Sequence, residues 1–140
     1  MATSIFHLAF PVHDIEATRK FYVDVLGCTI GRVGKRWIDF NFYGHQISAH
    51  LYDHEDMFIP SNPVDEQDIP IRHFGIVMRW GEWQHLAERL KREGVAFHIE
   101  PCVRFKGQVG EQATMFIKDP GNNYLEFKSF KDMGRLFARD

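Results

Sequence analysis

Hydrophobic and polar positions alternate along several short stretches of the chain, a pattern typical of β-strands with one buried face. Two of these stretches place a histidine third in an apolar run, IFHLAFPV at residues 5–12 and IRHFGIV at residues 71–77. Alternation puts His7 and His73 on the face opposite to the bulky apolar side chains. We expect those apolar side chains to pack under helices; they are Phe6, Phe10, Phe74 and Ile76.

Each histidine-containing stretch is followed by a helical pattern. In the first half, Asp14 is a plausible N-cap and apolar residues recur at three- and four-residue steps up to Gly27. In the second half, the same periodicity leads to Gly94. The distance from His7 to Gly27 is 20 residues and from His73 to Gly94 is 21 residues, which indicates a duplicated unit.

Three strand-like segments follow each predicted helix. They read CTIGRV, WIDFNF and QISAHLY in the first half, and VAFHI, ATMFIKD and NYLEFKSF in the second. We therefore predict an α+β fold in which one domain contains two βαβββ modules, at residues 4–52 and 71–130. The polar stretch 53–70 contains three prolines and is predicted to be a linker, and residues 131–140 a C-terminal tail.

Composition narrows the class of protein. A chain of 140 residues that is 44% hydrophobic can bury a sizeable core, and a net charge of −2 with interspersed signs provides no basic surface for nucleic acid or membranes. No apolar run approaches the roughly 20 residues of a membrane span, and the N-terminus does not resemble a signal peptide. We expect a cytoplasmic protein whose two cysteines, Cys28 and Cys102, are reduced.

The polar faces of the predicted strands carry the candidate chemistry. In the last strand of the second half, Glu126 lies among core-forming residues, where a carboxylate needs a strong partner. His7, His73 and Glu126 form the ligand set of a facial triad, and His50 would make the set four-coordinate. The alternative is that both histidines are hydrogen-bonded to backbone carbonyls in the core, that Glu126 is a surface charge on an edge strand, and that His50 faces solvent.

The stretches FYVDVLGC and DPGNNYLEF carry a family resemblance. The chain resembles the vicinal oxygen chelate superfamily, which includes glyoxalase I, extradiol-type dioxygenases and bleomycin-resistance binding proteins. The resemblance implies a cupped mixed sheet around one divalent ion, with His7, His73 and Glu126 as ligands. Fe²⁺ is the ion that an extradiol-type site would take, and Zn²⁺, Ni²⁺ and Mn²⁺ suit the same ligands. Glyoxalase I enzymes usually have Glu or Gln at a fourth position, where this chain offers His50, or Ser48 or Gln46 in another register.

This resemblance favours an extradiol-type dioxygenase that acts on a small substrate with vicinal oxygens. His50 and Tyr124 are the candidates for the acid–base group. Arg104 and Lys106, in the predicted loop 100–112, are candidates for binding an anionic substrate. A glyoxalase I-type lyase or isomerase and a metal-free small-molecule binding protein are the alternatives, and the resemblance also implies a homodimer.

Overall fold

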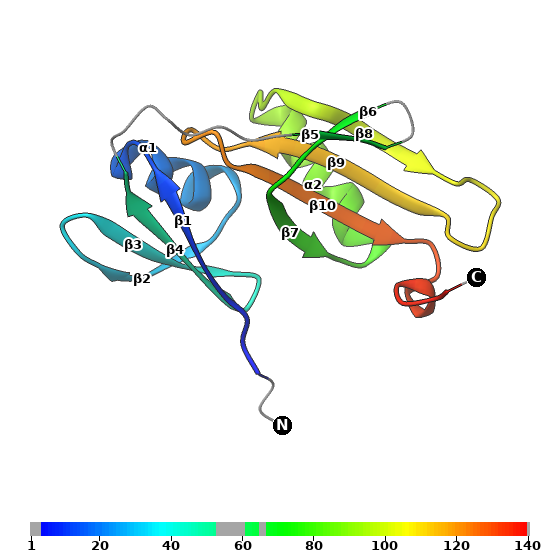
Figure 1. The fold of residues 1–140 in the computed structure, drawn as a ribbon, viewed down its shortest axis with the longest axis horizontal. Helices are drawn as coiled ribbons and strands as arrows, with labels where there is room; N and C mark the ends of the chain where they lie inside the picture. Colours follow the sequence, from blue (N-terminus) through cyan, green and yellow to red (C-terminus); the bar gives the residue numbers. More distant parts are fainter. Residues whose placement is uncertain (1–3, 53–60, 65–66, 140) are drawn as a thin grey trace. The chain divides into compact units, whose positions relative to one another are not determined.

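The structure is a computed structural model that describes residues 4–52, 61–64 and 67–139. The chain divides into two compact units (Figure 1). The first is drawn from residues 1–61 together with 119–123, and the second from residues 62–118 together with 124–140.

The first unit contains one four-stranded sheet and one helical segment. β1 (His7–Val12) leads into α1 (Ile15–Lys20), which continues as the π-helical turn η1 (Phe21–Val25). Three further strands complete the sheet: β2 (Thr29–Val33), β3 (Trp37–Phe42) and β4 (His45–Leu51). The strand order is β1-β4-β3-β2, with β1 parallel to β4 and the other pairs antiparallel.

The second unit repeats this arrangement. Its elements are β7 (His73–Val77), α2 (Trp80–Arg92), β8 (Phe97–Arg104), β9 (Gln112–Lys118) and β10 (Tyr124–Phe130). The order is β7-β10-β9-β8, again with one parallel pair, β7 with β10 (Figure 1). The α+β fold with two βαβββ units is therefore confirmed. The 3₁₀ turn η2 (Met133–Arg135) lies in the predicted tail.

The segment predicted as a linker contains two short strands, β5 (Ser61–Val64) and β6 (Gln67–Pro70), which form a separate two-stranded sheet. Ile69 of β6 is buried against Ile99 and Phe116. Periodicity did not indicate these strands, because a four-residue strand with two prolines nearby shows no alternation pattern.

The predicted helix ends are confirmed by their local geometry. The Asp14 side chain accepts a hydrogen bond from the Ala17 amide at 3.0 Å, which is N-cap geometry. Gly27 and Gly94 both adopt positive φ angles, 81° and 73°, a conformation that favours glycine and ends a helix.

Each helix covers one face of its own sheet. α1 packs on β3 and β4, and α2 packs on β9 and β10, where the Trp83 indole donates a hydrogen bond to the Phe127 carbonyl at 2.8 Å. The helix-facing side chains include the largest fully buried residues, among them Phe40, Ile47, Leu125 and Phe127. No helix of the described residues is long and apolar enough to cross a membrane.

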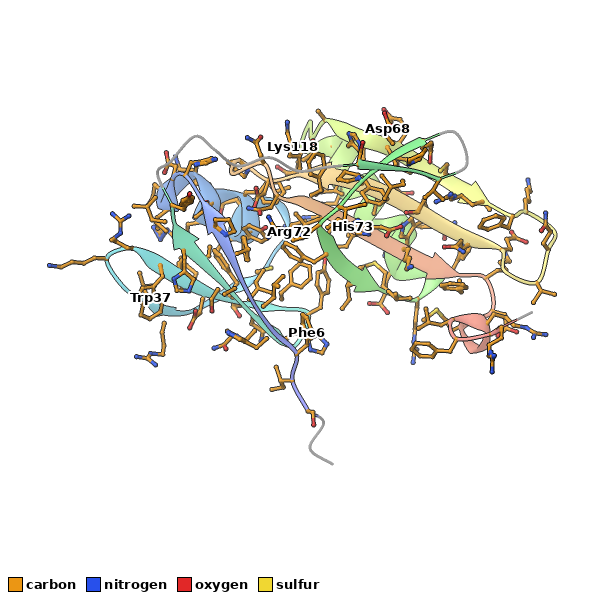
Figure 2. All side chains as sticks on the ribbon, in the orientation of Figure 1. Phe6, Trp37, Asp68, Arg72, His73 and Lys118 are labelled. Carbon is orange, nitrogen blue, oxygen red and sulfur yellow. The ribbon has the colours of Figure 1, made fainter. Side chains whose placement is uncertain are left out.

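Phe10 is buried as predicted, and Phe74 and Ile76 are partly buried. The prediction for Phe6 was wrong, because its side chain is 61% exposed at the start of β1 (Figure 2). The β1–β4 ladder begins only at His7. The Phe6 ring therefore lies beyond the end of the sheet, where it meets the imidazole of His45 at 6.4 Å between ring centroids.

Candidate functional site

His73 and Glu126 lie on neighbouring strands of the second sheet, and their side chains meet. β7 and β10 run parallel, with Gly75 opposite Glu126 and His73 opposite Tyr124. The His73 Nε2 atom is 3.2 Å from Glu126 Oε1. The structure thus brings together two of the three predicted ligands within one unit, and Figure 2 shows His73 at the start of β7.

A second contact, from Nδ1 to a backbone carbonyl, orients the His73 ring. Its Nδ1 atom is 2.7 Å from the Pro70 carbonyl, and because a carbonyl only accepts, Nδ1 carries a proton and donates. This contact directs Nε2 toward Glu126, as backbone carbonyls do for metal-binding histidines. The hydrogen bond to Glu126 raises the pKa of His73, outweighing the opposite effect of burial.

Glu126 is oriented in a similar way. The buried Thr114 hydroxyl donates to Oε2 at 2.6 Å, which leaves Oε1 toward His73. Burial alone would raise the pKa of Glu126, but the hydrogen bonds from His73 and Thr114, together with the charge of Lys128, lower it. The side chain is therefore a carboxylate at neutral pH.

Gly75 allows the two strands to approach at this point. A Cβ atom built on Gly75 would lie 1.6 Å from the Glu126 carbonyl oxygen, so no larger residue fits without moving the backbone. Gly75 is thus a condition for the close approach of β7 to the backbone of Glu126.

The His73–Glu126 pair fits a divalent cation. Two ligand atoms with bonds of about 2.1 Å to one ion at a right angle lie roughly 3 Å apart, and Nε2 and Oε1 are 3.2 Å apart. The pair borders a hollow of about 200 Å³. Within the part of the chain that the structure describes, no group of three or more His, Cys, Asp or Glu side chains could hold a metal ion. His7 belongs to the first unit, and its role as a ligand remains a prediction.

The matching register in the first unit identifies the residue equivalent to Glu126. Ala9 lies opposite Ser48, as Gly75 lies opposite Glu126, so Ser48 occupies the equivalent position. The Ser48 hydroxyl donates to the buried Asp39 carboxylate at 2.5 Å. His50 lies two residues further along β4, opposite Pro11 and Trp37, and is exposed.

The other predicted site residues occupy different parts of the second unit. Tyr124 is opposite His73, and its ring centroid is 5.0 Å from that of His98. Arg104 ends β8, and its guanidinium lies 5.6 Å from the centre of the Phe105 ring. Lys106 is exposed in the loop that follows β8.

Sequence reasoning missed several residues that shape the site. Thr114 and Lys128 each occupy the polar face of a strand, which alternation does indicate, but their partners depend on the ladder register. His98 donates from Nε2 to the Asp68 carbonyl at 3.1 Å, a contact with β6 that no sequence pattern indicated.

Comparisons with known proteins agree with this architecture. The family model described as Glyoxalase/Bleomycin resistance protein/Dioxygenase superfamily matches residues 4–127. The chain is 27% identical over 129 residues to glyoxalase domain-containing protein RDO1 of Mycosarcoma maydis, covering 92% of this chain and 69% of that protein. It is 35% identical to a glyoxalase/bleomycin resistance protein/dioxygenase from Alicyclobacillus acidocaldarius, whose crystal structure superposes with a TM-score of 0.81 over 96% of each chain.

A more distant structure shares the fold. The fosfomycin resistance protein FosX from Listeria monocytogenes is 18% identical, with a TM-score of 0.70 over 97% of this chain and 100% of that chain. At this level of identity, the likeness concerns the fold alone.

Proposed function

The chain belongs to the glyoxalase/bleomycin resistance protein/dioxygenase superfamily, and from this premise we propose that it is a divalent-metal-dependent dioxygenase of the extradiol type. The observation that carries the proposal is the His73–Glu126 pair. Its two ligand atoms converge at 3.2 Å, and a separate hydrogen bond holds each side chain in place.

His73, Glu126 and His7 are the proposed ligands, a two-histidine, one-carboxylate set that suits Fe²⁺. A divalent ion held by these residues would supply positive charge to two adjacent substrate oxygens and to dioxygen. The protein's part is orientation. Pro70 fixes the protonation of His73, and Thr114 fixes the direction of the Glu126 carboxylate.

The presence of Ser48 at the position equivalent to Glu126 favours a site with three ligands over an isomerase site with four. At the position equivalent to Glu126, the first unit offers a hydroxyl whose proton is already donated to Asp39. A neutral hydroxyl is a weak ligand and a poor general base, so a glyoxalase I-type reaction would have Glu126 alone as the carboxylate ligand that doubles as a base. This difference favours the dioxygenase.

Tyr124 is the candidate acid–base group in the same unit as the His73–Glu126 pair. Its position opposite His73 makes its phenol a group that can hold or deliver a proton beside the site. His50, the second candidate, lies on β4 of the first unit.

Metal titration tests the proposal directly. Anaerobically purified wild-type protein should bind about one Fe²⁺, Mn²⁺, Ni²⁺ or Zn²⁺ ion per chain, and the Fe²⁺ form should consume oxygen with catechols. His7→Ala, His73→Ala and Glu126→Ala should each lose metal binding, while His85→Ala on the exposed face of α2 serves as the matched control. A wild-type protein that binds none of these ions would overturn the proposal and favour a metal-free binding protein.

A His50 variant distinguishes a dioxygenase from an isomerase. In a three-ligand dioxygenase, His50→Ala should keep the metal and lose rate, by roughly 10²–10⁴-fold if His50 is the acid–base group. In a four-ligand isomerase whose fourth ligand is His50 rather than Ser48, His50→Ala should weaken metal binding as much as Glu126→Ala does, and oxygen uptake should be absent. Calorimetric metal titrations of both variants distinguish these outcomes.

A further inference from the structure

Lys128 lies on the same face of β10 as Glu126, two residues further along the strand. Two residues of an extended strand span about 7 Å, and residues i and i+2 share a face. In the sheet, Lys128 pairs with Val77 of β7 on one side and with Thr114 of β9 on the other. The Thr114 hydroxyl donates a hydrogen bond to Glu126. Lys128 therefore belongs to the immediate surroundings of the His73–Glu126 pair.

The hollow of about 200 Å³ beside the pair is also bordered by Lys128. Gly75, Ile76 and Val77 of β7 also line it. One small space thus has the two candidate ligands and a cation on its border. A compound that occupied this hollow could contact a metal ion held by the two ligands and also the Lys128 ammonium.

The Lys128 ammonium forms no ion pair with any described carboxylate, and the contact found for it is the Phe130 ring, 6.0 Å from Nζ. The Glu126 carboxylate feels the charge of Lys128, which lowers its pKa, but its hydrogen bonds are to His73 and Thr114 and it forms no ion pair with the Lys128 ammonium. A half-buried cation that borders a hollow and forms no ion pair with the described residues attracts an anion from solution.

We propose that Lys128 binds an anionic group of the substrate, so that the substrate class is a compound with vicinal oxygens and a carboxylate or similar anion a few ångströms away. This inference rests on the proposed function for the metal-binding end of the substrate. The anion-binding end rests on Lys128 alone. A lysine ammonium acts as a point charge with three donors, which suits a carboxylate without demanding a fixed geometry.

The proposal predicts that replacing Lys128 has different effects on the affinity for the metal ion and on the affinity for an anionic ligand. Lys128→Gln should leave metal affinity unchanged or tighter, because a positive charge near the cation is removed. It should also weaken the binding of 3,4-dihydroxybenzoate, while binding of uncharged catechol stays the same. If Lys128 had only a structural role, Lys128→Gln would weaken the binding of the metal ion, of 3,4-dihydroxybenzoate and of catechol together.

Anaerobic calorimetry on the metal-loaded protein measures these affinities. Wild-type protein should prefer 3,4-dihydroxybenzoate over catechol by roughly tenfold, as expected for a charge-assisted contact. Lys128→Arg should retain most of this preference and Lys128→Gln should lose it. Lys91→Gln, an exposed position in the last turn of α2, is the matched control and should behave as wild type.

A preference for the charged catechol that survives in Lys128→Gln would overturn the proposal. If wild-type protein binds neither catechol, the proposed function fails, and a second measurement then decides the anion site. Inorganic phosphate titrated into the metal-free, isotope-labelled protein should shift the amide resonances of residues 126–128, and Lys128→Gln should abolish these shifts. Absence of such shifts in the wild type would also overturn the proposal.

Discussion

Tyr22 is a fully buried phenol whose hydroxyl donates to the Asp119 carboxylate at 2.8 Å. Asp119 also accepts hydrogen bonds from the amides of Gly121 and Asn123, and the Asn123 side chain donates to the Pro11 carbonyl. The Tyr22–Asp119 and Asn123–Pro11 hydrogen bonds thus anchor the turn at residues 119–123 in the first unit. Burial, followed by the charge of Asp119, raises the pKa of Tyr22 well above its usual value.

Tyr22→Phe should lower the free energy of unfolding by about 1–3 kcal/mol at neutral pH, because the buried Asp119 carboxylate loses a donor. The raised pKa determines the pH dependence. Below pH 10, tyrosine is protonated in both folded and unfolded chains, so its contribution is complete; above pH 10, only the unfolded chain ionises, and stability is lost. Urea denaturation between pH 7 and 11 should show a steeper alkaline loss in wild type than in Tyr22→Phe. Parallel losses in the two proteins would contradict this prediction.

The short strand β6 connects two imidazoles to the sheet of the second unit. Its carbonyls at Asp68 and Pro70 are two residues apart and accept hydrogen bonds from His98 at 3.1 Å and from His73 at 2.7 Å. Between them, Ile69 packs against Ile99 and Phe116. β6 therefore acts as a backbone support for the imidazole that is proposed to bind metal.

His98→Ala should weaken metal binding by roughly three- to tenfold, less than the 10–100-fold typical of a residue that touches a metal ligand directly. The physical reason is that β6 loses one of its two hydrogen bonds to imidazoles, which loosens the Pro70 carbonyl behind His73. His98→Gln, which retains a side-chain N–H donor, should recover part of the affinity. Equal affinities of His98→Ala and wild type in zinc titrations would show that β6 is held without His98.

Metal binding should also stabilise the chain as a whole. An ion that binds only the folded protein raises the free energy of unfolding by about 2.7 kcal/mol at a free concentration about 100 times its dissociation constant. For a chain of 140 residues, this corresponds to a rise in Tm of roughly 5–10 °C. Thermal denaturation with a divalent ion and with a chelator measures the difference. Glu126→Ala should show no difference between the two conditions, and a full shift in that variant would place the ion elsewhere.

Much of the fold follows from local pattern. Alternation in HFGIV and YLEFKSF identified the strands and their faces, and it correctly separated Glu126 from Leu125 and Phe127. The helix signals at Asp14, Gly27 and Gly94 depend only on neighbouring residues, and all three are confirmed. The exposed Phe6 shows the limit of this reasoning, because alternation does not reveal where a ladder begins.

The sequence by itself determined the duplicated βαβββ order and the face of each strand, because both arise from periodicities within a few residues. Tertiary structure decided which residues on a face meet. Ser48 and His50 share a face of β4, so strand parity cannot distinguish them, and only the ladder with β1 places Ser48 at the position equivalent to Glu126. The contacts of Glu126 with His73 and Thr114 likewise require strands distant in sequence to pair in one register, which is a property of the folded chain.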